Sequence, residues 1–288
     1  MGEFILDKRE VRRSFERAAA SYDSAAILQR EVCRRMVERL VYIKQAPWVI
    51  LDAGAGTGFG SRELASLYPK STLIALDIAR AMLVQAREQE PWWRRVLPGS
   101  RIAWVCADWE NLPLKADAVG MIFSNLTLQW LNPERAFREA RRVLEPGGVF
   151  MFSTFGPDTL REMREAFRAA DGALHTSRFV DMHDLGDLLV HCGLTDPVMD
   201  MESFTLTYSQ MTDLMRDLKA IGAHHAELSR RRGLMGKSAW TKLARAYEQF
   251  RREGQLPATF EVVYGHAWKP KARTGPRGER VFEIQAKK

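Results

Sequence analysis

The feature that most constrains this chain is the glycine-rich run LDAGAGTGFG at residues 51–60, which directly follows the apolar segment PWVI. Its glycines recur at alternate positions, and Asp52 stands two residues before the first of them. A glycine-rich turn between a buried strand and a helix lets the backbone approach a ligand closely, at the edge where open α/β sheets bind ligands. The run therefore predicts an α/β fold with a ligand at the end of its first strand.

Up to residue 154, short apolar runs alternate with segments in which apolar residues recur at helical spacing. Strands that alternate with helices predict βαβ units, and therefore a mostly parallel sheet with helices on both faces. The expected strands are 48–52, 71–77, 101–108, 118–125 and 147–154, and the expected helices between them are 61–68, 79–89 and 133–144.

The beginning and the end of the chain follow other patterns. Residues 8–43 carry apolar side chains at three- and four-residue steps and are predicted to be helical, as are residues 184–194. Residues 198–208 and 259–268 alternate like strands and are expected to pair antiparallel at one edge of the sheet. The predicted fold is therefore a seven-stranded, mostly parallel sheet with an antiparallel edge strand.

Composition argues against several classes of protein. No apolar run approaches the roughly 20 residues that a membrane-spanning helix needs, so no membrane partner is expected. Cys33, Cys106 and Cys192 are odd in number and far apart, which argues against a disulfide framework and favours the reducing cytoplasm. The six histidines lack metal-ligand spacing, and no metal site is expected.

The formal net charge of +7 indicates an acidic partner. Much of the excess lies in the basic runs 230–237 and 269–280. Charge alone leaves the partner open between nucleic acid, an acidic protein and an anionic membrane. Because no nucleic-acid-binding motif accompanies the basic runs, no nucleic-acid partner is expected.

Acidic residues follow three successive predicted strands. The glycine spacing is G-x-G-x-G rather than the dinucleotide pattern G-x-G-x-x-G, and Asp52 beside it would repel a phosphate but attract a cation. Asp77 lies about twenty residues further on, where a carboxylate accepts hydrogen bonds from ribose hydroxyls. Asp108 and Trp109 follow the third strand, where they would bond an adenine amino group and cover its ring. A ligand with a cationic part and an adenosine part fits this set, and S-adenosylmethionine is the predicted cofactor.

These motifs resemble those of class I S-adenosylmethionine-dependent methyltransferases, in LDAGAGTGFG, in LD at 76–77, in ADWENLPL at 107–114 and in EPGG at 145–148. The predicted cofactor-binding residues are Asp52, Gly54, Gly56, Gly58, Asp77, Ile78, Asp108, Trp109 and Asn125, the last of which follows the fourth strand.

Stretches outside the cofactor loop resemble one family over nearly the whole chain, the malonyl-[acyl-carrier protein] O-methyltransferases of biotin synthesis. They are FERAAASYDSAAILQREV (15–32), FSNLTLQWL (123–131), FSTFGPDTLREMREAF (152–167), RFVDMHDLGDLLV (178–190), MRDLKAIGAHH (215–225) and LPATFEVVYGHAW (256–268). The resemblance implies methyl transfer from S-adenosylmethionine to the free carboxyl of a malonyl thioester. It also implies a Rossmann-like fold divided into a helical lid (1–46), a methyltransferase domain (47–268) with a helical insertion (209–255), and a basic tail (269–288).

The implied chemistry needs a cation near the substrate but no general base. A carboxylate with an ordinary pKa near 4 is already ionised at neutral pH, whereas a closed pocket requires a positive partner for it. Arg178, in the family segment RFVDMHD, is the first candidate for this clamp and Lys219 the second, with Phe179 as an apolar neighbour. The resemblance places Tyr22 in the lid, where we expect it to exclude water and act as a catalytic residue.

The family also implies an acidic partner, the acyl carrier protein, which we expect to dock on Arg230, Arg231, Arg232 and Lys237. Three alternatives stay open at this point. They are a small-molecule methyltransferase, a relative that methylates a protein arginine during respiratory-complex assembly, and a cofactor-binding protein without enzymatic activity.

Overall fold

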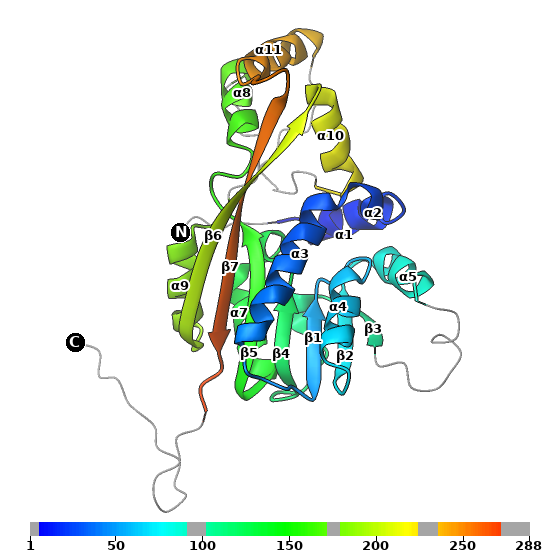
Figure 1. Cartoon of the computed structure of the whole chain (residues 1–288), viewed down its shortest axis with the longest axis vertical. Helices are drawn as coiled ribbons and strands as arrows, with labels where there is room; N and C mark the ends of the chain where they lie inside the picture. The colour runs from blue at the N-terminus through cyan, green and yellow to red at the C-terminus, as the bar shows by residue number, and fades with distance from the viewer. Residues whose placement is uncertain (1–5, 91–101, 172–178, 224–235, 272–288) are drawn as a thin grey trace, which may run out of the picture.

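A computed structural model describes residues 6–90, 102–171, 179–223 and 236–271. Its seven-stranded sheet has the order β3-β2-β1-β4-β5-β7-β6 (Figure 1). The first five strands are parallel, and β7 runs antiparallel to both of its neighbours. The predicted mostly parallel sheet and its antiparallel pair are confirmed, with β7 one place in from the edge and β6 outermost. The strands are β1 (Val49–Ala53), β2 (Thr72–Asp77), β3 (Ile102–Cys106), β4 (Val119–Ser124), β5 (Leu144–Phe155), β6 (Thr195–Tyr208) and β7 (Leu256–Trp268).

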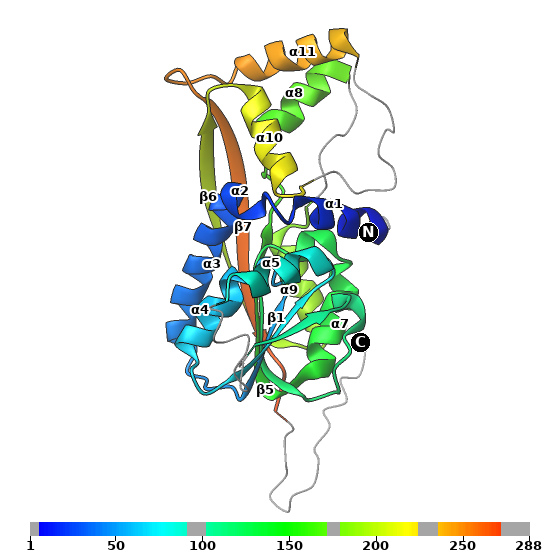
Figure 2. The same cartoon turned by 90° about the vertical axis from the view of Figure 1, so that its right-hand side faces the viewer.

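Helices cover both faces of the sheet, with α3 and α4 on one face and α7 and α9 on the other (Figures 1 and 2). Apolar side chains of α3 and α4 pack on β1 and β4, and those of α7 and α9 pack on β5. The α-helices are α1 (Lys8–Ala18), α2 (Tyr22–Ala25), α3 (Ile27–Arg39), α4 (Phe59–Leu67), α5 (Arg80–Glu88), α7 (Pro133–Val143), α8 (Arg161–Asp171), α9 (Met182–His191), α10 (Met211–Ala220) and α11 (Lys237–Glu248). Short 3-10 turns follow at η1 (Leu40–Tyr42), η2 (Trp109–Asn111) and η3 (Leu128–Trp130).

The strand order indicates which edge of the sheet binds a ligand. The chain order reverses between β1 and β4, and both strands are buried in the middle of the sheet, which explains their continuous apolar sequences. In open α/β sheets, ligands bind outside the carboxyl ends of the strands at such a reversal. The loops that follow β1, β2, β3 and β4 therefore meet at the edge where a ligand is expected.

The N-terminal segment is helical, but it is not the uninterrupted helix over 8–43 that its periodicity predicts. It consists of α1, α2, α3 and η1, with a break between α1 and α2. At this break the Ser21 hydroxyl donates to the carbonyl of Ala18 at 3.2 Å and to that of Ala220, at the end of α10, at 3.0 Å. A tertiary contact thus ends α1, and α1 and α2 lie across the carboxyl edge of the sheet (Figure 2).

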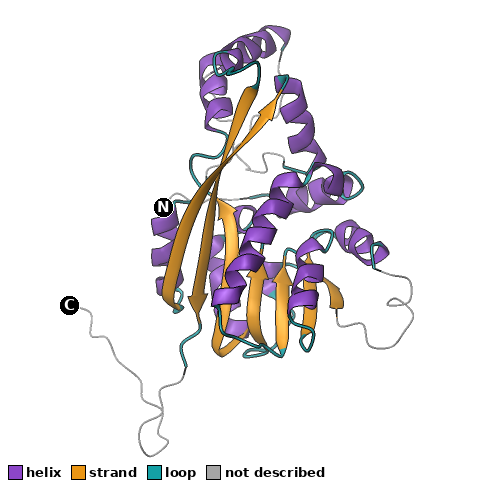
Figure 3. Ribbon diagram, in the orientation of Figure 1, coloured by secondary structure: helices purple, strands orange, loops and turns teal. Residues whose placement is uncertain are grey.

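Strands β6 and β7 form a long ribbon that extends beyond the rest of the sheet (Figure 3). Strand β5 ends at Phe155 opposite Val262, whereas β6 and β7 continue to pair as far as Tyr208 opposite Leu256. Helices α8, α10 and α11 lie at the far end of the ribbon. The predicted helical insertion before the last strand is confirmed in α10 and α11, and α8, which the sequence patterns do not predict, packs against α11.

The structure also bears on membrane-spanning helices, metal sites and disulfides. Within the residues that the structure describes, no helix combines the length and apolarity needed to cross a membrane. In the same parts of the chain, no three His, Cys, Asp or Glu side chains are grouped as a metal would require. The three cysteines are free, with Cys33 and Cys192 buried and Cys106 exposed.

Candidate active site

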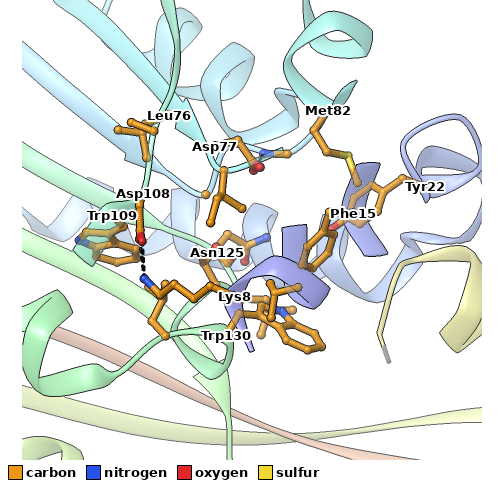
Figure 4. Close-up of a pocket in the computed structure, with 18 residues that line it drawn as sticks. Lys8, Phe15, Tyr22, Leu76, Asp77, Met82, Asp108, Trp109, Asn125 and Trp130 are labelled. Carbon is orange, nitrogen blue, oxygen red and sulfur yellow. Dashed lines mark hydrogen bonds and ion pairs between the residues drawn. The ribbon is translucent and has the colours of Figure 1, made fainter. Parts of the chain in front are cut away.

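A pocket lies at the carboxyl edge of the sheet, where the four strand-end loops meet the N-terminal segment (Figure 4). It brings together most of the residues predicted from the strand ends. Those that line it are Gly54 and Gly56 after β1, Asp77 at the end of β2 and Ile78 after it, Asp108 and Trp109 after β3, and Asn125 after β4. Tyr22, predicted for the lid, also lines it.

The glycine-rich loop has a left-handed backbone at Gly54, Gly56 and Gly58, with φ values of 83°, 53° and 79°. A β-carbon on Gly54 would lie 2.1 Å from the Thr127 hydroxyl, and one on Gly58 would lie 2.7 Å from the Trp104 ring. Gly56 differs, because nothing lies within 4 Å of the place where its β-carbon would be. Gly54 and Gly58 are thus required by packing, whereas Gly56 presents bare backbone to open space in the pocket.

Asp77 is held rigidly beside this loop. One of its carboxylate oxygens accepts a hydrogen bond from the Gly56 N–H at 2.9 Å, and the other accepts from the Ala79 N–H at 2.8 Å. Burial raises the pKa of Asp77 to about 6, although these two N–H groups oppose the shift. Each oxygen has a further lone pair, so the carboxylate can accept two hydroxyl groups of a ligand.

Asp108 and Trp109 form another wall of the pocket. Trp109 is buried, and its ring meets Phe150 edge-on at a centroid distance of 5.8 Å. Asp108 caps the turn that follows β3 by accepting from the Glu110 N–H at 2.9 Å. Both of its carboxylate oxygens also lie 2.6 Å from the Lys8 ammonium.

The N-terminal segment closes the pocket from above with Lys8, Val11, Phe15 and Tyr22. Phe15 meets the ring of Trp130 edge-on at 5.4 Å. Burial raises the pKa of the Tyr22 hydroxyl further above its ordinary value, so this side chain is neutral at physiological pH. The position of Tyr22 suits the role predicted for it, and the exclusion of water by its ring stays a prediction.

Two predicted cofactor residues do not line the pocket directly. Asp52 is buried near the start of α4, where its carboxylate accepts from the Ser61 hydroxyl at 2.5 Å. Gly58 is the N-cap of α4. Asn125 lines the pocket but is tied down, because its amide donates to the Gln29 carbonyl at 2.9 Å and accepts from the Ser153 hydroxyl at 3.0 Å. A direct contact between Asp52 and a cofactor stays a prediction.

The residues predicted for substrate and carrier protein lie mostly elsewhere. Phe179 packs against Phe155 at a centroid distance of 5.7 Å, and Lys219 lies in the last turn of α10. Neither is among the residues that line the pocket. Arg178, Arg230, Arg231 and Arg232 lie outside the described residues, and Lys237 begins α11 with a side chain that is also outside them.

Comparison with known proteins decides the family. The model of a methyltransferase domain matches residues 51–152, which run from within β1 to within β5 and include the loops between these strands. A malonyl-[acyl-carrier protein] O-methyltransferase of Gallionella capsiferriformans is 52% identical over 288 residues, covering 100% of this chain and 99% of the relative. One from Nitrosospira multiformis is 55% identical over 283 residues, covering 94% and 92%. The chain belongs to the malonyl-[acyl-carrier protein] O-methyltransferase family.

Solved structures similar to this methyltransferase show the same fold at low identity. The YcgJ protein of Bacillus subtilis has a TM-score of 0.56 at 13% identity and covers 83% of this chain and 99% of its own. A putative methyltransferase of Bacillus halodurans has a TM-score of 0.54 at 17% identity, covering 82% and 99%. They confirm the Rossmann-like class of the sheet.

The methyltransferase pocket also contains residues that the sequence analysis did not predict. Lys8, Val11 and Phe15 stand at helical spacing on one face of α1, so periodicity predicts their common orientation but not what they face. Thr127 and Met82 reach the pocket from the loop after β4 and from α5. Phe15 and Thr127 lie in stretches that resemble the family, but no motif assigns any of the five residues to the pocket, because their contacts depend on how distant segments dock.

Proposed function

We propose that this chain transfers a methyl group from S-adenosylmethionine to the free carboxylate of a malonyl thioester on acyl carrier protein, giving the methyl ester that biotin synthesis elongates. The observation that carries the proposal is the 52% identity to a malonyl-[acyl-carrier protein] O-methyltransferase over 100% of this chain. That similarity includes the segments outside the cofactor loop. The free cysteines support the cytoplasm as the place of the reaction.

The pocket residues fit S-adenosylmethionine. Gly56 leaves open space in which a ligand can lie against the protein backbone. Asp77 keeps acceptor capacity for ribose hydroxyls, and Asp108 offers a carboxylate to the adenine amino group. Burial raises the pKa of Asp77 and of the buried Asp52, and a cationic methionine end would stabilise their ionised forms. When bound, this cofactor supplies an electrophilic methyl group on a positively charged sulfur.

The protein's contribution to the transfer is alignment and the exclusion of water. A malonyl carboxylate needs no deprotonation at neutral pH, so no general base is required. We assign the substrate clamp to Arg178, with Lys219 as the second choice and Phe179 as its apolar neighbour. Arginine binds one carboxylate through two hydrogen bonds, and one oxygen must remain free to attack the methyl carbon. Tyr22 and the rest of the lid, which we take as residues 1–46, keep water from the carboxylate.

A transfer assay tests the proposed function. The protein would be incubated with methyl-labelled S-adenosylmethionine and either malonyl-carrier protein or acetyl-carrier protein. We expect label on the malonyl form alone, because the acetyl group has no free carboxylate. Arg178→Ala should reduce this labelling by about 100-fold or more, the scale of a lost charge-assisted clamp. Absence of label from both carriers, with cofactor binding intact, would overturn the assignment.

The proposed docking surface for the acidic carrier consists of Arg230, Arg231, Arg232 and Lys237, within a methyltransferase domain that we take as residues 47–268 with an insertion at 209–255. Replacing the three arginines by serine should slow methylation of malonyl-carrier protein about tenfold at low salt, because steering by charge raises association rates. Methylation of a small malonyl thioester serves as the control and should not change. Equal rates on the carrier at low salt would refute docking there. The basic tail, residues 269–288, is not needed for this proposal.

A further inference from the structure

Lys8, the first residue of α1, contacts the loop that follows β3. Its ammonium lies 2.6 Å from both carboxylate oxygens of Asp108 (Figure 4). It also lies 2.9 Å from an oxygen of Glu110. The side chains of Lys8 and Asp108 are 28% and 35% exposed, and that of Glu110 is 7% exposed. The three groups thus form a partly buried cluster that joins the N-terminal segment to the loop after β3.

The contact occupies the carboxylate that the proposed function assigns to adenine. Asp108 already accepts from the Glu110 N–H at 2.9 Å, and the Lys8 ammonium covers both oxygens. An exocyclic amino group is a donor of the same kind and would need the same acceptor positions. These contacts engage three of the four lone pairs of the carboxylate, so a donor from the ligand must either take the last one or displace the ammonium.

We propose that Lys8 competes with the adenine amino group for Asp108, which makes it a residue that sets cofactor affinity and eases the release of the spent cofactor. This inference rests on the proposed role of Asp108 in the methyltransferase. Glu110 gives the displaced ammonium a second partner at 2.9 Å, so that binding of adenine does not leave a partly buried cation unpaired. The Glu110 carboxylate is itself held by the Asn132 N–H at 2.7 Å.

Other contacts keep the lid in place when Lys8 moves. The Glu16 carboxylate on α1 accepts from the N–H groups of Arg80 and Ala81, at the start of α5, at 2.8 and 3.0 Å. Asp23 accepts from the Thr57 hydroxyl of the glycine-rich loop at 2.6 Å. Lys8, Glu16 and Asp23 therefore contact the loops after β3, β2 and β1, respectively. Of these three lid side chains, Lys8 is the one that contacts a carboxylate assigned to the ligand. Its replacement should leave the lid attached.

Binding measurements on the full-length protein test the competition. Dissociation constants would be measured by calorimetry for S-adenosylhomocysteine and for its analogue that carries purine in place of adenine and so lacks the amino group. Lys8→Met should bind S-adenosylhomocysteine about fivefold more tightly, the fold-change expected from removing a partly exposed ion pair. The analogue should bind parent and variant equally. Arg9→Met, at the exposed neighbouring position, is the matched control and should behave as the parent does.

Two further variants make the test independent of one substitution. Lys8→Arg keeps a competing cation and should bind close to the parental level. Glu110→Gln weakens the second partner, so the ammonium should hold Asp108 more firmly and S-adenosylhomocysteine should bind a few-fold more weakly. The proposal is overturned if Lys8→Met binds S-adenosylhomocysteine no more tightly, or gains equally with both ligands. If the parent binds neither ligand, the proposed cofactor site itself is wrong.

Discussion

Gly54→Ala is expected to weaken S-adenosylmethionine binding by about 100-fold or more and to lower the free energy of unfolding by about 2–4 kcal/mol. The new β-carbon would lie 2.1 Å from the hydroxyl oxygen of Thr127 and 2.7 Å from its β-carbon. Rotation of the threonine side chain relieves the first overlap but not the second. The left-handed φ of 83° adds its own penalty for a residue with a side chain. Either the glycine-rich loop or the loop after β4 must therefore shift.

Calorimetric binding and urea unfolding would measure the two effects. Gly236→Ala is the matched control, because its φ of −66° is ordinary and no atom lies within 4 Å of an added β-carbon. A second change tests the cause: Thr127→Gly combined with Gly54→Ala removes the overlap and should restore part of the lost affinity, leaving the backbone penalty. Parental cofactor affinity in Gly54→Ala would show that this close approach is not needed for the pocket.

The sequence predicted most of the cofactor pocket because its residues follow strands. Asp77 and Asp108 come at the ends of β2 and β3, and the chain's alternation of strands and helices brings those ends to one edge. Local pattern and tertiary position are linked by a simple rule there. The same rule does not show that Asp52, one residue before the end of β1, bonds to Ser61 and is not among the residues that line the pocket, because the direction of one side chain depends on packing.

The lid could not be predicted in the same way. The apolar spacing within 8–43 is real for α3, but the break before α2 contains no glycine or proline. It is maintained by Ser21, whose hydroxyl bonds to the Ala220 carbonyl 199 residues away. The pairing of Lys8 with Asp108 spans 100 residues in the same manner. Contacts of this kind depend on the docked position of α1, which no local pattern contains.

Asp52→Asn is expected to raise the free energy of unfolding at pH 8 by on the order of 2 kcal/mol. Burial holds the pKa of Asp52 at about 7, against an ordinary value of 3.8, with the Ser61 hydroxyl lowering it and the Asp77 carboxylate raising it. A folded-state pKa above the unfolded value means that stability present below about pH 4 is lost as the pH rises through about 7. Asparagine keeps an acceptor for Ser61 and carries no charge, so the variant avoids that loss.

Urea unfolding between pH 4 and pH 8 would show the difference growing with pH and vanishing near pH 4. Asp184→Asn, on the exposed start of α9, is the control and should change stability by less than about 1 kcal/mol.

A carboxylate kept at a cost to folding needs a use, and the cation proposed beside it provides one. Asp52→Asn should therefore weaken binding of the positively charged S-adenosylmethionine more than that of the uncharged-sulfur product, S-adenosylhomocysteine. Equal losses for the two ligands, or equal stability at pH 8, would mean that no ionised Asp52 acts on the sulfonium.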